Sequence, residues 1–238
     1  MDMEKNYHIE DFTEVHYKEL LYKAKHRFRF AFYREEPSDN KAFWRHDVDY
    51  SPERALRIAE IERDAGVRST FFFQTGSLFY SILEDPTAEL IRSIAGMGHD
   101  IGLHFDPAAG RGLALEKGIL EVIAGRKVEA FSLHNPDKTS IDNHTEHVIE
   151  GMVNAYSEIF RKSCAYCSDS NGYWRHRRLA DFLYEESGSI QVLTHPVWWQ
   201  DKPMMPRERI VRCAELRRIK CMEWYDSFLY ECGRENVR

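Results

Sequence analysis

Short apolar runs alternate with longer amphipathic segments along most of the chain. The short runs are bounded by turn residues and predict strands at 42–49, 69–73, 100–104, 130–134, 165–168 and 190–195. Apolar residues at helical spacing between them predict helices at 52–65, 85–97, 113–124, 145–158 and 177–186. Two further helical regions are expected at the ends, at about 8–26 and about 205–238.

Strands that alternate with helices at this spacing are typical of parallel strands joined by right-handed crossovers. No linker, low-complexity segment or repeat divides the chain. The sequence therefore predicts an α/β fold in which residues 1–238 form a single barrel-like domain.

Composition excludes several classes of protein. Lys plus Arg number 33 and Asp plus Glu number 39, so the formal charge is −6 and no basic excess is present to neutralise nucleic-acid phosphates. No run approaches the roughly 18 apolar residues of a membrane span, and the start lacks the apolar core of a signal peptide. We therefore expect a cytoplasmic protein. Its five cysteines are expected as free thiols, with Cys164 and Cys167 buried in a strand.

Ionisable residues follow most of the predicted strands. They are Asp47, Asp49, His104, His134, Asp169 and His195. In a parallel barrel all strands end on the same face, where active sites lie, so these six side chains should converge. Any one of them alone is more often a helix cap or a satisfied polar residue, but helix caps do not favour histidine.

Asp47 and Asp49 share one face if the strand is regular, because they are two residues apart. Two carboxylates this close repel each other unless a cation lies beside them. A divalent metal would relieve the repulsion and leave one carboxylate as ligand and the other as general base. The alternative is a turn in which Asp49 helps to cap the next helix. His104 is a candidate imidazole ligand, and its alternative is a core histidine.

Several motifs together resemble the polysaccharide deacetylase family, the NodB-homology domains of carbohydrate esterase family four. The resemblance extends over about residues 40–200. The matching segments are the aspartate pair, Gly66–Phe72 (GVRSTFF), Gly98–His104 (GHDIGLH), Ser168–Ser170 with Trp174, and Leu193–His195 (LTH). The resemblance implies a distorted (β/α)7 barrel of parallel strands.

The resemblance also implies metal-dependent N-deacetylation of acetylated amino sugars. Carried over to this sequence, Asp47 is the catalytic base, Asp49 and His104 are metal ligands, and His195 is the general acid. Asp169 would orient His195 and raise its pKa. Histidine and carboxylate ligands suit zinc, which is the expected ion, although Fe, Co, Ni and Mn also accept them.

The chain departs from the family pattern at the third metal ligand. Ala108 stands where the family has a second histidine. His134 is the first replacement to consider because it follows the next strand. Asp106 is the second and His99 the third.

The arginine that orients the family's base is also missing from its usual place, and Arg45 or Arg175 could substitute for it. Trp174, Trp198 and Trp199 follow predicted strand ends and could stack on a sugar, with Arg175 as a further substrate-binding residue. The alternative for the tryptophans is a hydrophobic rim packed under the C-terminal helix.

The sequence thus predicts a metal-dependent hydrolase that removes an N-acetyl or similar acyl group from an amino sugar. A cytoplasmic location favours a nucleotide- or lipid-linked precursor of a surface polysaccharide as substrate. A catalytically degenerate carbohydrate-binding barrel is the alternative, and a hydrolase of a different amide is a third. The oligomeric state is not indicated.

Overall fold

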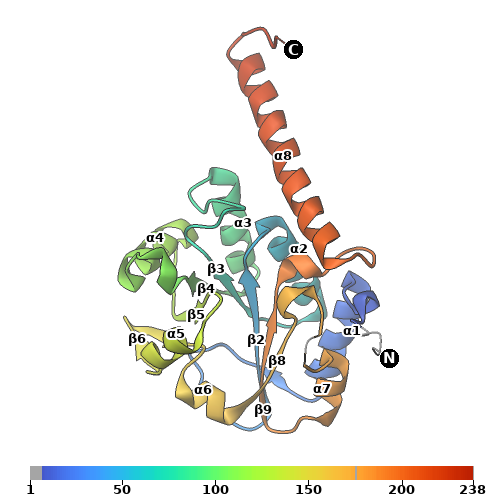
Figure 1. The fold of residues 1–238 in the computed structure, drawn as a ribbon, viewed down its shortest axis with the longest axis vertical. Helices are drawn as coiled ribbons and strands as arrows, with labels where there is room; N and C mark the ends of the chain where they lie inside the picture. The colour runs from blue at the N-terminus through green and yellow to red at the C-terminus, as the bar shows by residue number, and fades with distance from the viewer. Residues whose placement is uncertain (1–6, 175, 238) are drawn as a thin grey trace, which may run out of the picture.

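Seven parallel strands form a curled sheet in the computed structural model, which describes residues 7–174 and 176–237 (Figure 1). Their order is β7-β5-β4-β3-β2-β9-β8. Their bounds are β2 Lys41–Val48, β3 Thr70–Phe73, β4 Asp100–Phe105, β5 Ala130–Leu133, β7 Met152–Asn154, β8 Cys164–Ser168 and β9 Ser189–Thr194. Two short strands are added: β1 Arg29–Phe30 pairs parallel with β2, and β6 Val148–Ile149 pairs antiparallel with β7. The prediction of a distorted (β/α)7 barrel is confirmed.

Helices cover the outside of the sheet, except that most of α8 projects away from it (Figure 1). They are α1 Glu14–Lys25, α2 Pro52–Ala65, α3 Asp85–Gly96, α4 Leu113–Ala124, α5 Lys138–Asn143, α6 Glu158–Ser163, α7 Leu179–Glu185 and α8 Pro206–Glu231. The ends of α2 follow from its sequence. The Ser51 hydroxyl accepts a hydrogen bond from the backbone N–H of Arg54 at 3.2 Å, and Pro52 occupies the first turn. Gly66 ends the helix with φ +69°, a conformation that glycine adopts without strain.

The helix predicted at 145–158 is wrong. This segment contains the β6–β7 hairpin, whose turn has positive φ at Glu150 and Gly151. The side-chain amide of Asn154 donates to the carbonyls of His144 and Glu146, at 2.6 and 3.2 Å. These local side-chain bonds favour a compact turn over a helix.

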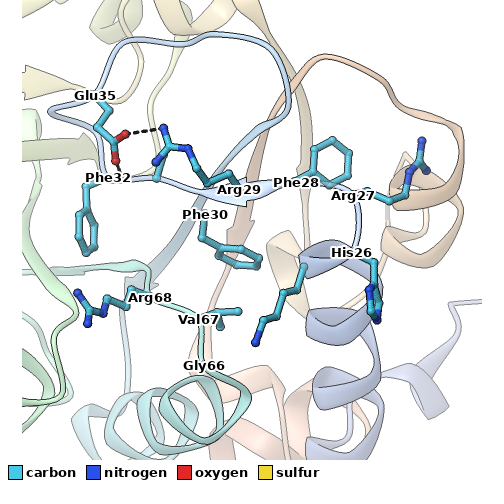
Figure 2. A pocket seen from close by; sticks show the side chains of 12 residues that line it. His26, Arg27, Phe28, Arg29, Phe30, Phe32, Glu35, Gly66, Val67 and Arg68 are labelled. Atoms are coloured by element: carbon cyan, nitrogen blue, oxygen red, sulfur yellow. Dashed lines mark hydrogen bonds and ion pairs between the residues drawn. The ribbon is translucent and has the colours of Figure 1, made fainter.

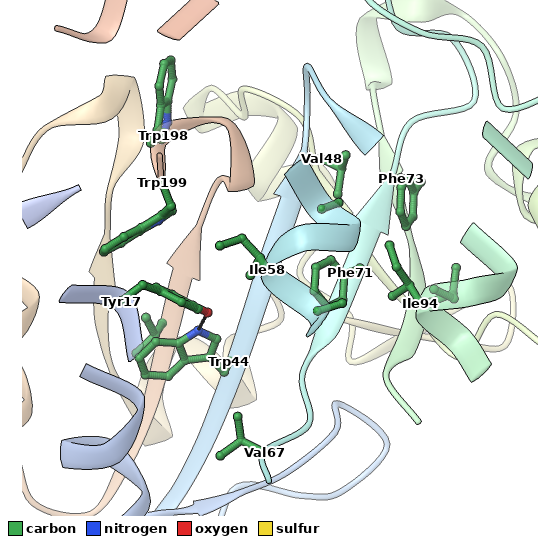
Figure 3. Packing of buried hydrophobic residues seen from close by; sticks show 14 of the residues in the cluster. Tyr17, Trp44, Val48, Ile58, Val67, Phe71, Phe73, Ile94, Trp198 and Trp199 are labelled. Carbon is green, nitrogen blue, oxygen red and sulfur yellow. Dashed lines mark hydrogen bonds between the residues drawn. The ribbon is translucent and has the colours of Figure 1, made fainter. Parts of the chain in front are cut away.

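Strand β2 lies between two apolar cores, and its side chains face one core or the other in alternation. The larger core lies between the sheet and the helices, where Trp44 donates its indole N–H to the Tyr17 hydroxyl at 2.9 Å (Figure 3). The smaller core fills the barrel interior, and it includes Tyr33, Phe43, Phe72 and Phe160. Side chains on successive residues of a strand point to opposite faces, so His46 faces the helices while Arg45 and Asp47 face the interior.

The barrel has a seam between β7 and β8. Within the described residues, the sheet order ends at β8 on one side and at the β6–β7 hairpin on the other. Side chains bridge this gap. Phe160 of α6 packs against Phe43 and Tyr33 with ring centroids 4.9 and 5.0 Å apart. Arg45 donates to the Tyr156 hydroxyl at 2.9 Å.

Cys164 and Cys167 are buried free thiols on β8, as predicted. Burial raises the pKa of Cys164 to about 11 and that of Cys167 to about 12. Thiols held this far from ionisation are poor nucleophiles and poor metal ligands at neutral pH.

Candidate metal centre

Three neighbouring strands bring one carboxylate and two imidazoles together where they end. Asp49 follows β2, His104 lies near the end of β4, and His134 follows β5. One ligand atom from each lies within 4.8 Å of the others. Asp49 Oδ1 is 3.1 Å from His104 Nε2 and 3.4 Å from His134 Nδ1, and the two imidazole nitrogens are 3.1 Å apart. This is a candidate site for a divalent cation.

The surroundings of these three side chains fit a metal. His104 Nδ1 is hydrogen-bonded to the Ser132 hydroxyl at 2.7 Å, which leaves Nε2 directed at Asp49. Burial would raise the pKa of Asp49, but hydrogen bonds from His104 and His134 hold it well below its ordinary value. A ligand must be deprotonated to bind a cation, and Asp49 meets that condition. One carboxylate with two imidazoles is a donor set that zinc accepts.

Gln74 also reaches this cluster, although nothing in the sequence analysis selected it. Its side-chain nitrogen donates to Asp49 Oδ1 at 3.0 Å and lies 3.0 Å from His134 Nδ1. It directly follows β3, so its place at a strand end was the available signal. We interpret it as a residue that orients the Asp49 carboxylate.

Asp47 lies beside the candidate metal site and is almost fully buried. Its Oδ1 accepts from the Ser132 hydroxyl at 3.3 Å, and its Oδ2 lies 3.8 Å from His104 Nδ1. Arg45, also buried, donates to Oδ2 at 3.4 Å. Of the two arginines considered, Arg45 is the one that the structure places at the Asp47 carboxylate, and Arg175 lies outside the described residues.

His195 faces the cluster from the end of β9. Its Nδ1 is 2.6 Å from Asp169 Oδ1, and its Nε2 is 3.7 Å from Asp49 Oδ2. Burial would lower the pKa of His195, but the carboxylates of Asp169, Asp49 and Asp47 outweigh it and raise that pKa to about 9. The imidazole is consequently protonated at neutral pH and can donate a proton.

Asp169 is fixed by donors from the chain around it. Both carboxylate oxygens accept from the backbone N–H of His195 at 3.0 Å, and Oδ2 also accepts the indole N–H of Trp199 at 3.0 Å. These bonds fix the carboxylate and, through it, the orientation of the His195 ring.

Two of the tryptophans predicted to bind sugar belong instead to the core. Trp199 is fully buried, and its ring packs against Tyr17 with centroids 4.7 Å apart. Trp174 donates its indole N–H to Asp11 at 2.9 Å and stacks on Phe12. Since the faces of both rings are covered by protein, the prediction of a sugar platform on Trp174 and Trp199 is corrected.

Trp198 differs from these two. It is 5% exposed, and its ring lies 6.5 Å from that of His195 and 5.6 Å from that of Tyr50. Its indole N–H has no hydrogen-bond partner among the described residues. It lines a hollow of about 390 Å³ at the base of α8. Trp198 is therefore the tryptophan of the three that stays a candidate for the rim of the site.

The two lesser candidates for the third ligand have other hydrogen-bond partners. Asp106 accepts from the backbone N–H of Ala108 at 2.9 Å and so caps the short turn after β4. His99 is fully buried: its Nδ1 accepts from the backbone N–H of Ser69 at 3.2 Å, and its Nε2 lies 3.1 Å from the carbonyl of Ala59. His134 is the candidate that the structure places beside Asp49 and His104.

A hollow of about 770 Å³ lies at the opposite end of the barrel, between β1 and the turn that precedes β3 (Figure 2). Two of the cations that line it are bound by the protein itself. Lys25 donates to the carbonyl of Ala65 at 2.7 Å, and Arg29 pairs with Glu35 at 2.7 Å. It contains no candidate nucleophile or metal cluster among the described residues that line it, so we place no reaction there.

No protein-family model matches the chain, and no curated protein matches it. Several solved structures do match the chain. The match to a family 4 acetyl xylan esterase from Clostridium thermocellum, solved with a cobalt ion, has 16% identity and a TM-score of 0.47, and covers 74% of this chain and 84% of that one. The catalytic domain of a peptidoglycan N-acetylglucosamine deacetylase from Eubacterium rectale has 12% identity and a TM-score of 0.48, with 76% and 87% covered.

A CE4 family pseudoenzyme from Bacillus anthracis is also similar, with 14% identity, a TM-score of 0.42, and 74% of this chain and 60% of that chain covered. The similar structures thus include an esterase, a deacetylase and a pseudoenzyme. Because their TM-scores are below 0.5, we base the functional interpretation on the side chains of this chain.

Proposed function

We propose that the protein is a metal-dependent hydrolase that removes an N-acetyl or similar acyl group from an amino sugar. The observation that carries the proposal is the convergence of the Asp49, His104 and His134 ligand atoms within 4.8 Å, beside a buried carboxylate and a histidine–aspartate pair. The motifs that resemble the polysaccharide deacetylase family support the same chemistry.

Asp49, His104 and His134 would hold the cation, for which zinc is our first choice. A divalent ion bound there supplies Lewis acidity that polarises the amide carbonyl and stabilises the developing oxyanion. Asp47 accepts the proton of the attacking water. Arg45 holds the Asp47 carboxylate in place through the 3.4 Å contact.

His195 donates a proton to the departing amine. Asp169 accepts from Nδ1, so the other ring nitrogen, Nε2, carries its proton toward the cluster. A base on one side of the scissile amide and an acid on the other divide the two proton transfers that amide hydrolysis needs.

The substrate class that we propose is a nucleotide- or lipid-linked N-acylated amino sugar. This depends on the predicted cytoplasmic location and on the family resemblance. Among the described residues, no helix is both long and apolar enough to cross a lipid bilayer. A barrel that only binds sugar was suggested by Ala108, but His134 offers an imidazole in place of the missing histidine, which favours the enzyme.

The test is acetate release from a panel of nucleotide-linked and lipid-linked N-acetylated amino sugars. We expect turnover by the zinc-loaded protein, and a loss of about 10²–10⁴-fold in Asp47→Asn with the ion retained. Ion content by elemental analysis and the circular dichroism spectrum serve as controls. Normal turnover in Asp47→Asn would show that the base is misassigned, and a zinc-loaded protein that binds these sugars without cleaving any would favour the binding barrel.

A further inference from the structure

The hollow of about 390 Å³ at the base of α8 lies on the side of the barrel where the strands end (Figure 1). Two segments that follow strands meet there. Tyr50 directly follows the candidate ligand Asp49, and Trp198 follows His195 by three residues. The ring centroid of Trp198 lies 5.6 Å from that of Tyr50 and 6.5 Å from that of His195. The hollow therefore adjoins the general acid of the proposed mechanism.

The lining of the hollow is mostly apolar. Helix α8 supplies the aliphatic side chains of Pro206, Ile210, Val211 and Ala214, and the barrel supplies the rings of Tyr50 and Trp198. None of the described residues that line it is acidic. Sites for small molecules have volumes of about 300–1,000 Å³ and a lining of this kind, with a few polar groups that orient the ligand.

Polar groups at the hollow lack partners. Trp198 is 5% exposed, and its buried indole N–H forms no hydrogen bond with a described residue. Over residues 7–174 and 176–237, the Tyr50 hydroxyl and the Asn171 side-chain amide form none either. A buried polar group without a partner costs free energy, so a ligand that offers polar atoms to these groups is favoured.

The hollow also carries an unpaired positive charge. Arg207 lines it, is exposed, and forms no ion pair within the described part of the chain. The adjacent acid, Glu208, instead accepts a backbone N–H at 2.7 Å and so caps the start of α8. Because α8 begins at this end, the positive end of its dipole lies there as well. These features favour an anionic ligand.

Arg209 adds a second positive charge close by. It is fully buried, and its Nη1 donates to the carbonyl of Gly172 at 3.1 Å, whereas its Nε and Nη2 have no partner among the described residues. Burial lowers the pKa of Arg209 to about 10, and Asp169 and Glu208 offset this only in part. Arg209 is therefore still charged at neutral pH, and no acid of the described chain lies within ion-pair distance of it.

We propose that this hollow binds the nucleotide of a nucleotide-linked N-acylated amino sugar, with the base against Tyr50 and Trp198 and the phosphates near Arg207. Aromatic rings stack on bases, and guanidinium groups bind phosphates. This inference rests on the proposed function and selects the nucleotide-linked substrate over the lipid-linked one. The nucleotide of such a substrate is attached at the anomeric carbon, within one sugar ring of the acylated nitrogen. Its subsite must therefore adjoin His195, which protonates that nitrogen, and the hollow does.

A polyprenyl chain and a neutral glycan match the hollow less well. The hydrocarbon of a lipid-linked sugar has no polar atom for the Tyr50 hydroxyl or the Asn171 amide. A neutral glycan has no charge to offset that of Arg207. A base has a flat face and polar edges, and the diphosphate that links it to a sugar supplies the anion, so a nucleotide satisfies all three features.

Calorimetric titration of the zinc-loaded full chain tests this subsite without any need for turnover. The probes are the diphosphates of uridine, thymidine, cytidine, guanosine and adenosine, with inorganic pyrophosphate and a neutral N-acetylglucosamine trimer for comparison. We expect one or more of the nucleotides to bind about tenfold more tightly than pyrophosphate, or better. The proposal is overturned if none of the nucleotides binds, if pyrophosphate binds equally well, or if the neutral trimer displaces the nucleotide.

Val211→Glu and Leu216→Glu form a matched pair of variants on α8. The two side chains are 57% and 48% exposed, so both variants should fold, but of the two only Val211 lines the hollow. Val211→Glu places a carboxylate in the subsite and should weaken nucleotide binding by about tenfold or more, as should Arg207→Gln, whereas Leu216→Glu should not. Zinc content is kept equal, because a diphosphate can also bind the ion. Unchanged nucleotide binding in Val211→Glu would mean that the nucleotide binds elsewhere and overturns the proposal.

Kinetics separate this inference from the proposed function. With a nucleotide-linked substrate, Val211→Glu should raise KM by about tenfold and change kcat less, because the hollow binds a part of the substrate that does not react. Turnover of lipid-linked substrates alone would sustain the hydrolase and overturn the nucleotide subsite. Nucleotide binding that Val211→Glu weakens, in a protein that cleaves none of the substrates, would sustain the subsite and contradict the hydrolase.

Discussion

Two clusters of carboxylates and imidazoles lie back to back on the two faces of the sheet. One contains Asp49, His104 and His134 at the ends of the strands. The other lies between the sheet and helices α1 and α2, where Tyr17, His46, Ser69 and His99 surround Glu62. Both have the residue types of a metal or catalytic site, but they differ in what their polar atoms can still bind.

Glu62 is saturated by the protein. Its Oε1 accepts from the Tyr17 hydroxyl at 2.6 Å and lies 2.9 Å from His46 Nε2, while its Oε2 accepts from the Ser69 hydroxyl at 2.5 Å. His99 is 3.5 Å from the same carboxylate and is fully buried. Because every group has a partner within the fold, this cluster is interpreted as structural.

In the cluster at the strand ends, by contrast, the possible metal-ligand atoms of the three side chains face one another. Asp49 Oδ1 lies within 3.4 Å of two imidazole nitrogens, and the mouth of the barrel leaves Asp49 and His134 partly exposed. The comparison teaches that residue type alone does not define a site. The face of β2 from which a side chain projects decides which cluster it joins, since His46 and Asp47 are neighbours in the chain but belong to different clusters.

Removal of a ligand is the strongest test of this difference. His104→Ala should abolish acyl release, because two remaining ligands hold a divalent ion poorly, and the ion content measured by elemental analysis should fall from one per chain toward none. His99→Gln is the matched control in the other cluster and should keep the ion. Equal ion loss in the two variants would contradict the division into a site and a structural cluster.

The Asp169–His195 pair gives the next largest effect. The carboxylate of Asp169 raises the pKa of His195, and a general acid works only while it is protonated, so activity falls as the pH rises through that pKa. Asp169→Asn lowers the pKa, so the alkaline limb of the pH–rate profile should move to lower pH, with about 10²-fold lower kcat. The profile is measured with the ion content of both proteins matched. An unshifted limb would mean that His195 is not the acid.

Glu62→Gln should affect stability and leave catalysis nearly unchanged. Burial would raise the pKa of Glu62, but His46, His99 and Ser69 lower it overall. The charged form therefore stabilises the fold above the unfolded-state pKa, and that contribution is lost as the pH falls through the folded-state pKa. Urea unfolding at neutral pH should show a loss of about 3–5 kcal/mol, with a smaller difference in acid. Loss of turnover in the folded variant would connect Glu62 to catalysis.

The sequence was sufficient for most strands because each is a fully buried apolar run with a polar end. It was also sufficient to select Asp49, His104 and His134, since each lies at or just after a strand end. The failure at 145–158 came from a turn at Glu150 and Gly151 that apolar spacing does not reveal.

The sequence alone could not predict which residues of distant strands contact each other across the sheet. Ser132 is positioned by the register of two strands, because it lies opposite His104 in the β4–β5 pair. Trp199 looks like a rim residue from its position in the sequence, but in the fold its indole N–H donates to Asp169 and its ring is buried. Pairings of this kind depend on which distant segments become neighbours, and no local pattern encodes them.

The seam between β7 and β8 affects where the barrel can open locally. Side chains such as Tyr156 and Phe160 close it, whereas backbone hydrogen bonds join β2 to β9. Parting packed side chains exposes fewer hydrogen bonds than separating two paired strands, so local opening there costs less free energy. Deuterium should therefore enter the amides of β8 that face the seam well before those between β2 and β9, and the wall opposite β2 is the part of the barrel that can open most easily.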